Sequence, residues 1–417
     1  MTRLSVKSAL CFLFTVILND LYCQEDSLQK MAPKVYIDCP ICGEQGVDYI
    51  RQNLTWVNYV RDRKLAQIHV IITNQRNGSG GKEYTLTFVG QLEFAGNNDT
   101  LVFSSKPDDT DLDIQENGLQ MLKLGLIQYL AHTPLAPYLD ISYDAESAPV
   151  IAGDKWDSWV FEASVNGWFE SQESVNSINS WGSFNADRIT PDWKWEFNLG
   201  ASYSEDRFII NGQTVLGISR SQWFSATGVK SLSDHWSVGG TASARSSLYD
   251  NIKLLYGASP AIEYNIYPYS ESTRRQLRIM YDAGAYFRQY NDTTIFDKTE
   301  ELLWKQSLHV ALEVVKTWGT VSASVSYANY LHDFSKYHVS LRSRISLRLL
   351  KGLSLHISGR VAFLRDQLAL PKQGASAEEI LLEQKELATN YTAWGNVGFS
   401  YTFGSIYNNV VNPRFGD

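Results

Sequence analysis

Two histidine and aspartate pairs come nearest to a catalytic arrangement in this chain. His332 is followed by Asp333, and Asp234 is followed by His235. A His-Asp pair facing a second acidic pair can activate water for hydrolysis. Adjacent residues on a strand point to opposite faces, however, and no second acidic pair is placed opposite His332. Because the nucleophile motif GxSxG is also missing from the sequence, we expect no catalytic residues and predict a protein that is not an enzyme, with a hydrolase as the weaker alternative.

Cys39 and Cys42 form a CxxC motif. Such a motif serves as a redox pair, as half of a zinc site or as a local disulfide. The chain has four cysteines, and the other two, Cys11 and Cys23, lie in or beside an N-terminal leader, so no second CxxC completes a zinc site. The favoured interpretation is a disulfide between Cys39 and Cys42, or two unpaired thiols, and we predict no metal and no cofactor.

The glycine-rich segment 78–82 has the composition of a phosphate-binding loop without its spacing. Arg76 stands where the first glycine of GxxxxGK[ST] belongs, and a strand follows the segment instead of a helix. We therefore interpret it as a flexible hairpin turn.

Arg61, Asp62 and Arg63 form a compact charge cluster after an apolar stretch. A solvated turn is the favoured interpretation, and a contact with a lipid headgroup or a partner is the alternative.

The second part of the chain, which carries both histidine and aspartate pairs, repeats one unit. From residue 157 to 405, runs of about ten residues alternate apolar and polar side chains and end in Trp or Tyr. In 277–288, for example, Leu277 and Ile279 share one face and Arg278 and Asp282 the other. Soluble sandwiches alternate too, but their strands have about five or six residues. Long strands, aromatic ends and connections that are alternately short and long favour a transmembrane β-barrel.

Twelve strands are predicted in this region, which we place at 155–405. Their ranges are 157–170, 176–188, 193–204, 214–231, 235–249, 252–267, 274–290, 301–317, 319–331, 335–350, 353–366 and 389–404. An even number brings both ends of the barrel to one side, and short turns mark the periplasmic side of such barrels. The expected fold is mainly β, an antiparallel up-and-down barrel of about 12 strands in the outer membrane, with the N-terminal domain and the tail 406–417 in the periplasm.

The chain before the barrel has two parts. Arg3 and Lys7 precede a short apolar stretch at 9–18, which predicts a signal peptide at 1–24. Residues 25–145 are predicted to form a small α+β periplasmic domain. Its expected strands are 35–38, 56–60, 68–74, 82–90 and 100–105, and its expected helices are 48–54 and 111–132. Thr110 and Asp113 loosely fit a capping box for the second helix.

The inward positions of the predicted barrel form a lumen charge network. Its acids are Glu162, Glu170, Glu196, Glu263, Asp282 and Glu313, and its bases are Arg245, Arg278, Arg288, Arg342, Arg344, Arg348 and Arg360. Acids dominate the first half of the barrel and arginines the second, so the two sets would face each other across a closed lumen. Either the charges pair and fill a closed barrel, or they set up a transverse field across a small pore.

Several strings of the sequence resemble a family of outer-membrane proteins from Bacteroidota and related bacteria. They are "VYIDCPIC", "VNYVRDRKLAQIHVIIT", "GGKEYTLTFVG", "FAGNNDTLVF" and "YTFGSIYNNVVNPRF". The resemblance covers nearly the whole mature chain. It implies a periplasmic α/β domain followed by an outer-membrane β-barrel in a Gram-negative cell, and it transfers no activity or catalytic residue.

Two functional classes follow from these predictions. The first is a porin-like role in transport of small solutes, or a docking and assembly role through the periplasmic domain. The second is a structural membrane anchor or adaptor without transport. The expected partners are outer-membrane lipid and a periplasmic protein, and a net charge of −8 argues against nucleic acid.

Overall fold

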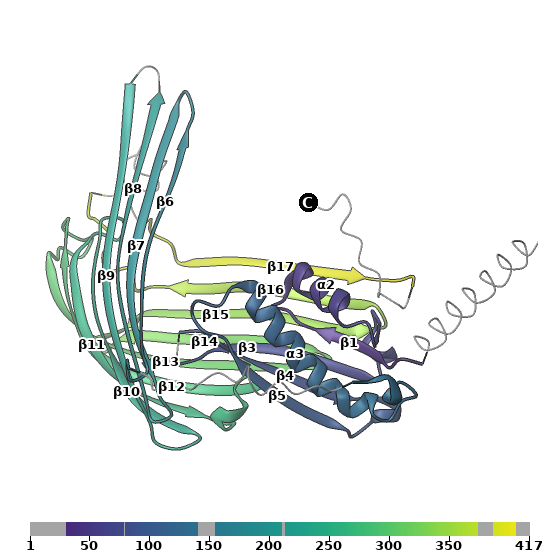
Figure 1. Cartoon of the computed structure of the whole chain (residues 1–417). Coiled ribbons are helices and arrows are strands. Elements are labelled where there is room, and N and C mark those ends of the chain that lie inside the picture. The colour runs from purple at the N-terminus through teal and green to yellow at the C-terminus, as the bar shows by residue number, and fades with distance from the viewer. Residues whose placement is uncertain (1–30, 79, 141–154, 211–212, 374–386, 406–417) are drawn as a thin grey trace, which may run out of the picture.

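The computed structural model describes residues 31–78, 80–140, 155–210, 213–373 and 387–405. The chain builds two sheets, one of five strands and one of twelve (Figure 1). The predicted signal peptide and the predicted tail at 406–417 lie outside the described residues.

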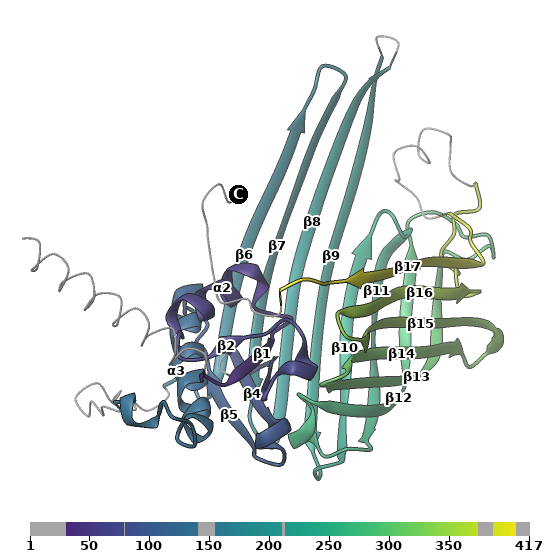
Figure 2. The same ribbon diagram turned by 90° about the vertical axis from the view of Figure 1, so that its right-hand side faces the viewer.

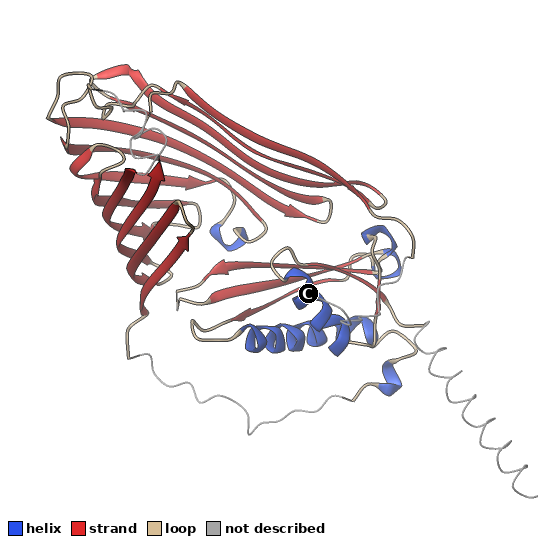
Figure 3. Cartoon of the chain, turned by 90° about the horizontal axis from the view of Figure 1, so that it is seen from above, coloured by secondary structure: helices blue, strands red, loops and turns tan. Residues whose placement is uncertain are grey.

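The five-stranded sheet belongs to an α/β domain. Its strands are β1 (Lys34–Asp38), β2 (Asn58–Tyr59), β3 (Ile68–Arg76), β4 (Lys82–Gly90) and β5 (Asn98–Ser104), in the order β2-β1-β3-β4-β5. β1 is parallel to β2 and β3, and the other pairs are antiparallel. Helices α2 (Gly43–Asn53) and α3 (Asp111–Leu130) cover one face (Figure 3). Short 3-10 helices are η1 (Arg63–Leu65), η2 (Leu92–Phe94) and η3 (Ala136–Tyr138).

The core of this domain lies between its sheet and its helices. Ile68 and Phe88 of the sheet and Leu126 of α3 are fully buried there. Gly125 lets α3 approach the sheet, because a Cβ at this position would lie 2.1 Å from the Phe88 ring. The predicted capping box is confirmed: Thr110 accepts a hydrogen bond from the Asp113 backbone and Asp113 from the Thr110 backbone.

The larger sheet confirms the predicted number and order of strands. Each strand is antiparallel to its neighbours in sequence. The strands are β6 (Trp159–Ser171), β7 (Val175–Ile189), β8 (Trp193–Ile210), β9 (Gln213–Ser231), β10 (Trp236–Ser247), β11 (Ile252–Asn265), β12 (Arg275–Tyr290), β13 (Glu300–Lys316), β14 (Gly319–Tyr330), β15 (Asp333–Leu350), β16 (Leu353–Leu364) and β17 (Tyr391–Tyr401). The helix η4 (Tyr269–Glu271) lies between β11 and β12.

Strands β8 and β9 are longer than predicted. Residues 205–210, expected in a loop, continue β8 because they pair with β9 from Ile218 to Gln213. These strands rise with β6 and β7 as a long arm beyond the rest of the sheet (Figures 1 and 2).

The prediction of a closed barrel is wrong for this structure. The sheet runs from β17 to β6, and within the described residues these two strands form edges that do not pair with each other. The α/β domain lies on the concave side, in the space between the two ends of the sheet (Figures 2 and 3).

The face turned away from the α/β domain is apolar. On β6, Phe161, Val165 and Phe169 expose 50%, 90% and 80% of their surface, and they alternate with residues that point toward the domain. None of the helices in the described residues is long and apolar enough to cross a membrane.

Candidate functional site

The α/β domain forms ion pairs with the large sheet at two places, which together we call the docking interface. The first contact joins the end of β3 to the start of the sheet. Arg76 Nη2 lies 3.3 Å from Asp187 Oδ2 on β7 and 3.8 Å from Glu162 Oε2 on β6. Nearby, Ser272 Oγ donates to Gln75 Oε1 at 3.2 Å. A cation at the end of β3 therefore meets the acidic end of the sheet.

Glycines beside Arg76 bring the two surfaces close together. A Cβ on Gly78 would lie 2.3 Å from the Ile189 carbonyl oxygen, and one on Gly80 would lie 2.4 Å from Val160 Cγ1. Gly80 also has a φ of +80°, which favours glycine. The segment forms the predicted hairpin turn, since Arg76 pairs with Lys82. Its glycines are thus required both by the turn and by its contact with β6 and β7.

The second contact joins β1 to the other end of the sheet. Arg348 of β15 donates from Nη2 to Asp38 Oδ1 at 2.5 Å, and its guanidinium lies 5.5 Å from the centre of the Tyr36 ring. Arg348 Nη1 also donates to the Thr317 carbonyl at 3.3 Å. In return Arg63 Nη2 donates to the Arg348 carbonyl at 3.4 Å. Here an anion of the domain meets the basic end of the sheet.

His69 supports Asp38 from behind. It is fully buried, its Nε2 lies 3.3 Å from Asp38 Oδ2, and its ring packs edge-on against Tyr36 at 5.0 Å. Burial lowers the pKa of His69, and the hydrogen bond to Asp38 opposes that shift without reversing it. Burial raises the pKa of Asp38, but the hydrogen bonds to His69 and Arg348 outweigh it, so the net shift is downward. At neutral pH a neutral His69 therefore lies beside a charged Asp38.

A disulfide between Cys39 and Cys42 lies directly after Asp38. It spans the turn from β1 into α2, so it restricts the backbone at the point where Asp38 leaves the sheet. This disulfide is one of the arrangements left open by the sequence.

The predicted lumen charges are not paired across a lumen. Within the described residues, Glu162 and Arg348 are the members of this set that form ion pairs with the α/β domain. The other acids make local contacts: Glu263 with Arg278 at 3.8 Å, Asp282 with His309 at 3.7 Å, Glu196 with Lys194 at 3.0 Å, Glu313 with Gln276 at 2.7 Å, and Glu170 with Gln172. Because the sheet is open, the expected pairing of its two halves is replaced by pairs on the same or neighbouring strands and by pairs with the α/β domain.

The remaining predicted bases divide into two groups. Arg245 pairs with Asp250, and Arg288 Nη2 donates to Tyr330 Oη at 3.5 Å. Arg342, Arg344 and Arg360 have no ion pair within the described residues, and Arg342 lies directly opposite Arg360 in the β15–β16 register. An uncompensated cationic strip therefore lies on the concave face of β15 and β16.

The sequence did not reveal which residues of the α/β domain contribute to the docking interface. Arg76 and Asp38 are single charges at the ends of β3 and β1, and their sequence neighbours gave no signal of a partner more than a hundred residues away. The available signal was the separation of acids and arginines between the two halves of the predicted barrel. A domain that docks against both halves must present cations to the acidic half and anions to the basic half.

The two histidine and aspartate pairs take part in local hydrogen bonds. Asp333 accepts hydrogen bonds from Ser335, and His235 Nδ1 lies 2.8 Å from the Asn265 carbonyl oxygen. The described residues also contain no group of three or more His, Cys, Asp or Glu side chains able to hold a metal ion.

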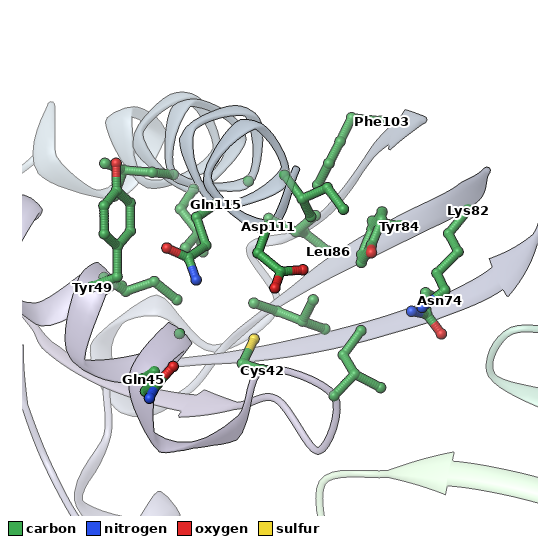
Figure 4. A pocket seen from close by; sticks show the side chains of 18 residues that line it. Cys42, Gln45, Tyr49, Asn74, Lys82, Tyr84, Leu86, Phe103, Asp111 and Gln115 are labelled. Carbon is green, nitrogen blue, oxygen red and sulfur yellow. The ribbon is translucent and has the colours of Figure 1, made fainter. Parts of the chain in front are cut away.

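A cavity of about 530 Å³ lies on the helix face of the α/β domain (Figure 4). Tyr84, Leu86 and Phe103 give it an apolar floor, and Asp111 and Gln115 of α3 contribute polar groups. Because Leu86 packs toward the helices, this cavity lies on the opposite face of the small sheet from Asp38 and His69.

Comparison with known proteins gives only distant likenesses. No family model matches the chain, and no curated protein matches it. Among solved structures, the NanC porin covers 59% of this chain and 99% of its own length, at 9% identity and a TM-score of 0.29. The β domain of the Bordetella autotransporter BrkA covers 59% and 98%, at 11% identity and a TM-score of 0.23. At such low TM-scores neither likeness supports an inference about function.

Proposed function

We propose that this chain is an outer-membrane β-barrel protein that passes small solutes, and that its α/β domain is the plug. The observation that carries the proposal is the docking interface: one domain pairs at once with the acidic end of the sheet through Arg76 and with the basic end through Asp38. Those concave charges are the ones that would line a pore. A docked domain therefore covers the surface along which a solute would pass.

Membrane placement is supported by the two faces of the sheet. The face away from the domain carries exposed large apolar side chains, such as Phe161, Val165 and Phe169 of β6, whereas the concave face carries Glu162 and Arg348. That distribution matches lipid outside and water inside. A shift of register by one residue would reverse the faces of a strand and place its charges in lipid.

Membrane insertion also requires closure. An unpaired strand edge in hydrocarbon costs several kcal/mol for each unsatisfied backbone group. We infer that the inserted form pairs β6 with β17 and that the domain then moves toward the periplasmic rim. The charges at the docking interface then set how often the domain covers the lumen of the closed barrel.

Planar-bilayer conductance of the full chain tests this function. Asp38→Arg or Arg348→Asp alone places like charges in contact, so each variant is expected to open more often than the wild type. The double variant with both changes restores the ion pair and is expected to return to wild-type behaviour. Absence of channel activity from the wild type and from all three variants would refute the transport function.

The ion selectivity of the open state gives a second readout. Arg342→Glu with Arg344→Glu reverses two charges that have no ion pair within the described residues. We expect the open channel to shift toward cations. An unchanged selectivity would place these side chains outside the conducting path.

A docking role is the second candidate, and the cavity in Figure 4 favours it. It faces away from the docking interface, so a partner can occupy it while the domain remains docked. A variant Phe103→Asp that loses a stoichiometric periplasmic partner of the full chain, with conductance unchanged, would support this role over solute passage.

A further inference from the structure

We propose that a cavity between the α/β domain and the β15–β16 turn binds a phosphate-bearing anion. The cavity has a volume of about 490 Å³. Its domain side includes Arg51, Arg61, Arg63 and Lys64, and its sheet side includes Arg348. The two parts of the chain thus surround it with five cationic side chains.

The charge of this cavity is not cancelled by nearby acids. Arg51 pairs with Asp48 at 2.7 Å, and Arg348 pairs with Asp38. With Asp62, three carboxylates oppose five cationic side chains, which leaves a net charge of +2 in a chain whose net charge is −8. Within the described residues no ion pair involves Arg61, Arg63 or Lys64. The cavity is therefore cationic in a protein whose net charge is negative.

Asp62 is the only acid among the described residues that line the cavity. Its Oδ1 accepts a hydrogen bond from the Lys64 backbone at 2.9 Å, and its Oδ2 is buried. One oxygen of its carboxylate thus shapes the 61–64 loop, and the other is buried away from the cavity surface. The arginine and lysine side chains of that loop keep the cavity cationic.

The structure holds this loop in place on both sides. η1 begins at Arg63, which donates to the Arg348 carbonyl at 3.4 Å. Ser354 and Thr402, which also line the cavity, add hydroxyl donors from the sheet side. Clustered cations are costly to desolvate without a counter-charge. A phosphate group offsets that cost best, because its oxygens accept several charge-assisted hydrogen bonds at once from guanidinium groups.

The position of the cavity gives two sources for this phosphate. It lies at the tight connection between Leu350 and Leu353, the side of the barrel predicted to face the periplasm. A lipid headgroup of the inner leaflet and a free phosphate compound both reach that level. The shared chemistry is a terminal dianionic phosphate group, and the experiment has one arm for each source.

The test uses the full chain in a neutral detergent and isothermal titration calorimetry. Inorganic phosphate is one ligand, short-chain phosphatidic acid is the other, and phosphatidylcholine of equal chain length is the neutral reference. The variant Arg61→Ala with Lys64→Ala removes two cations whose side chains take no part in the docking interface. The control, Lys106→Ala with Lys123→Ala, removes two cations of the same domain outside the cavity.

We expect the wild type and the control to bind phosphate or phosphatidic acid, and the cavity variant to bind about tenfold or more weakly. Binding of phosphatidic acid alone identifies a lipid source, and binding of inorganic phosphate identifies a free compound. Binding of neither ligand, or equal loss in the control and the cavity variant, would overturn the proposal. Because conductance is measured separately, failure of this site leaves the plug function standing, and the reverse also holds.

Discussion

The two contacts of the docking interface differ in burial and therefore in what they contribute. At the first contact Arg76 and Glu162 leave more than half of their side chains exposed, and only Asp187 is mostly buried, with 13% exposed, whereas at the second contact Asp38 and Arg348 expose 10% and 22%. Exposed ion pairs contribute between about 0 and 1 kcal/mol, but breaking a buried pair costs several. The β15 contact should therefore hold the domain in place, while the β6–β7 contact sets its orientation through close packing of glycines.

The largest expected effect comes from breaking the buried pair. Arg348→Ala leaves Asp38 with His69 as its remaining side-chain partner, and we expect the docked state to lose about 3 kcal/mol. Hydrogen exchange of β1 and β3 in the full chain measures this loss as a lower opening free energy. If Arg76→Ala lowers that free energy more than Arg348→Ala does, the proposed difference between the contacts is wrong.

The next effect tests close packing at the other contact. Gly80→Ala strains a backbone at positive φ, which costs about 1 to 2 kcal/mol, and adds a Cβ that meets Val160. Gly96 is the matched control, because its φ is +89° and a Cβ there meets nothing within 4 Å. Gly80→Ala should thus weaken protection of the β3–β4 hairpin beyond the loss seen in Gly96→Ala. Equal losses would mean that contact with β6 adds nothing to backbone strain.

The β15 contact should also depend on pH through His69. Burial lowers the pKa of His69 below its usual 6.5, so the unfolded chain binds a proton that the folded domain excludes. The stability of the domain is therefore complete above about pH 6.5 and falls as the pH drops toward the folded pKa. The pKa of Asp38 is lowered from its usual value as well, so its carboxylate stays charged across this pH range.

Thermal unfolding of the full chain at about pH 7.5 and about pH 5.5 checks this dependence. The wild type should be less stable at the lower pH, and His69→Gln should reduce the difference between the two. A difference that persists unchanged in His69→Gln would assign the pH dependence to another group.

The sequence predicted the elements better than their arrangement. The alternation of apolar and polar residues, as in Leu277, Arg278 and Ile279, is a local property. This kind of pattern was enough to predict the twelve strands and their order. Closure depends on a contact between β6 and β17, which are about 230 residues apart, and no local pattern reports it. For the same reason, no local pattern predicted the pairing of Asp38 with Arg348, which are far apart in the sequence. The sequence did predict which half of the sheet is mainly acidic and which half is rich in arginine.

The smallest effect is expected at the exposed pair. Arg76→Ala removes a cation that lies 3.3 Å from Asp187, and we expect a loss below about 1 kcal/mol that shrinks further as salt is added. Arg348→Ala should keep most of its effect at the same salt concentration, because its pair is shielded from solvent. Hydrogen exchange of both variants at low and high salt separates the two contacts. A salt-independent loss in Arg76→Ala would show that Arg76 stabilises this contact through packing rather than through charge.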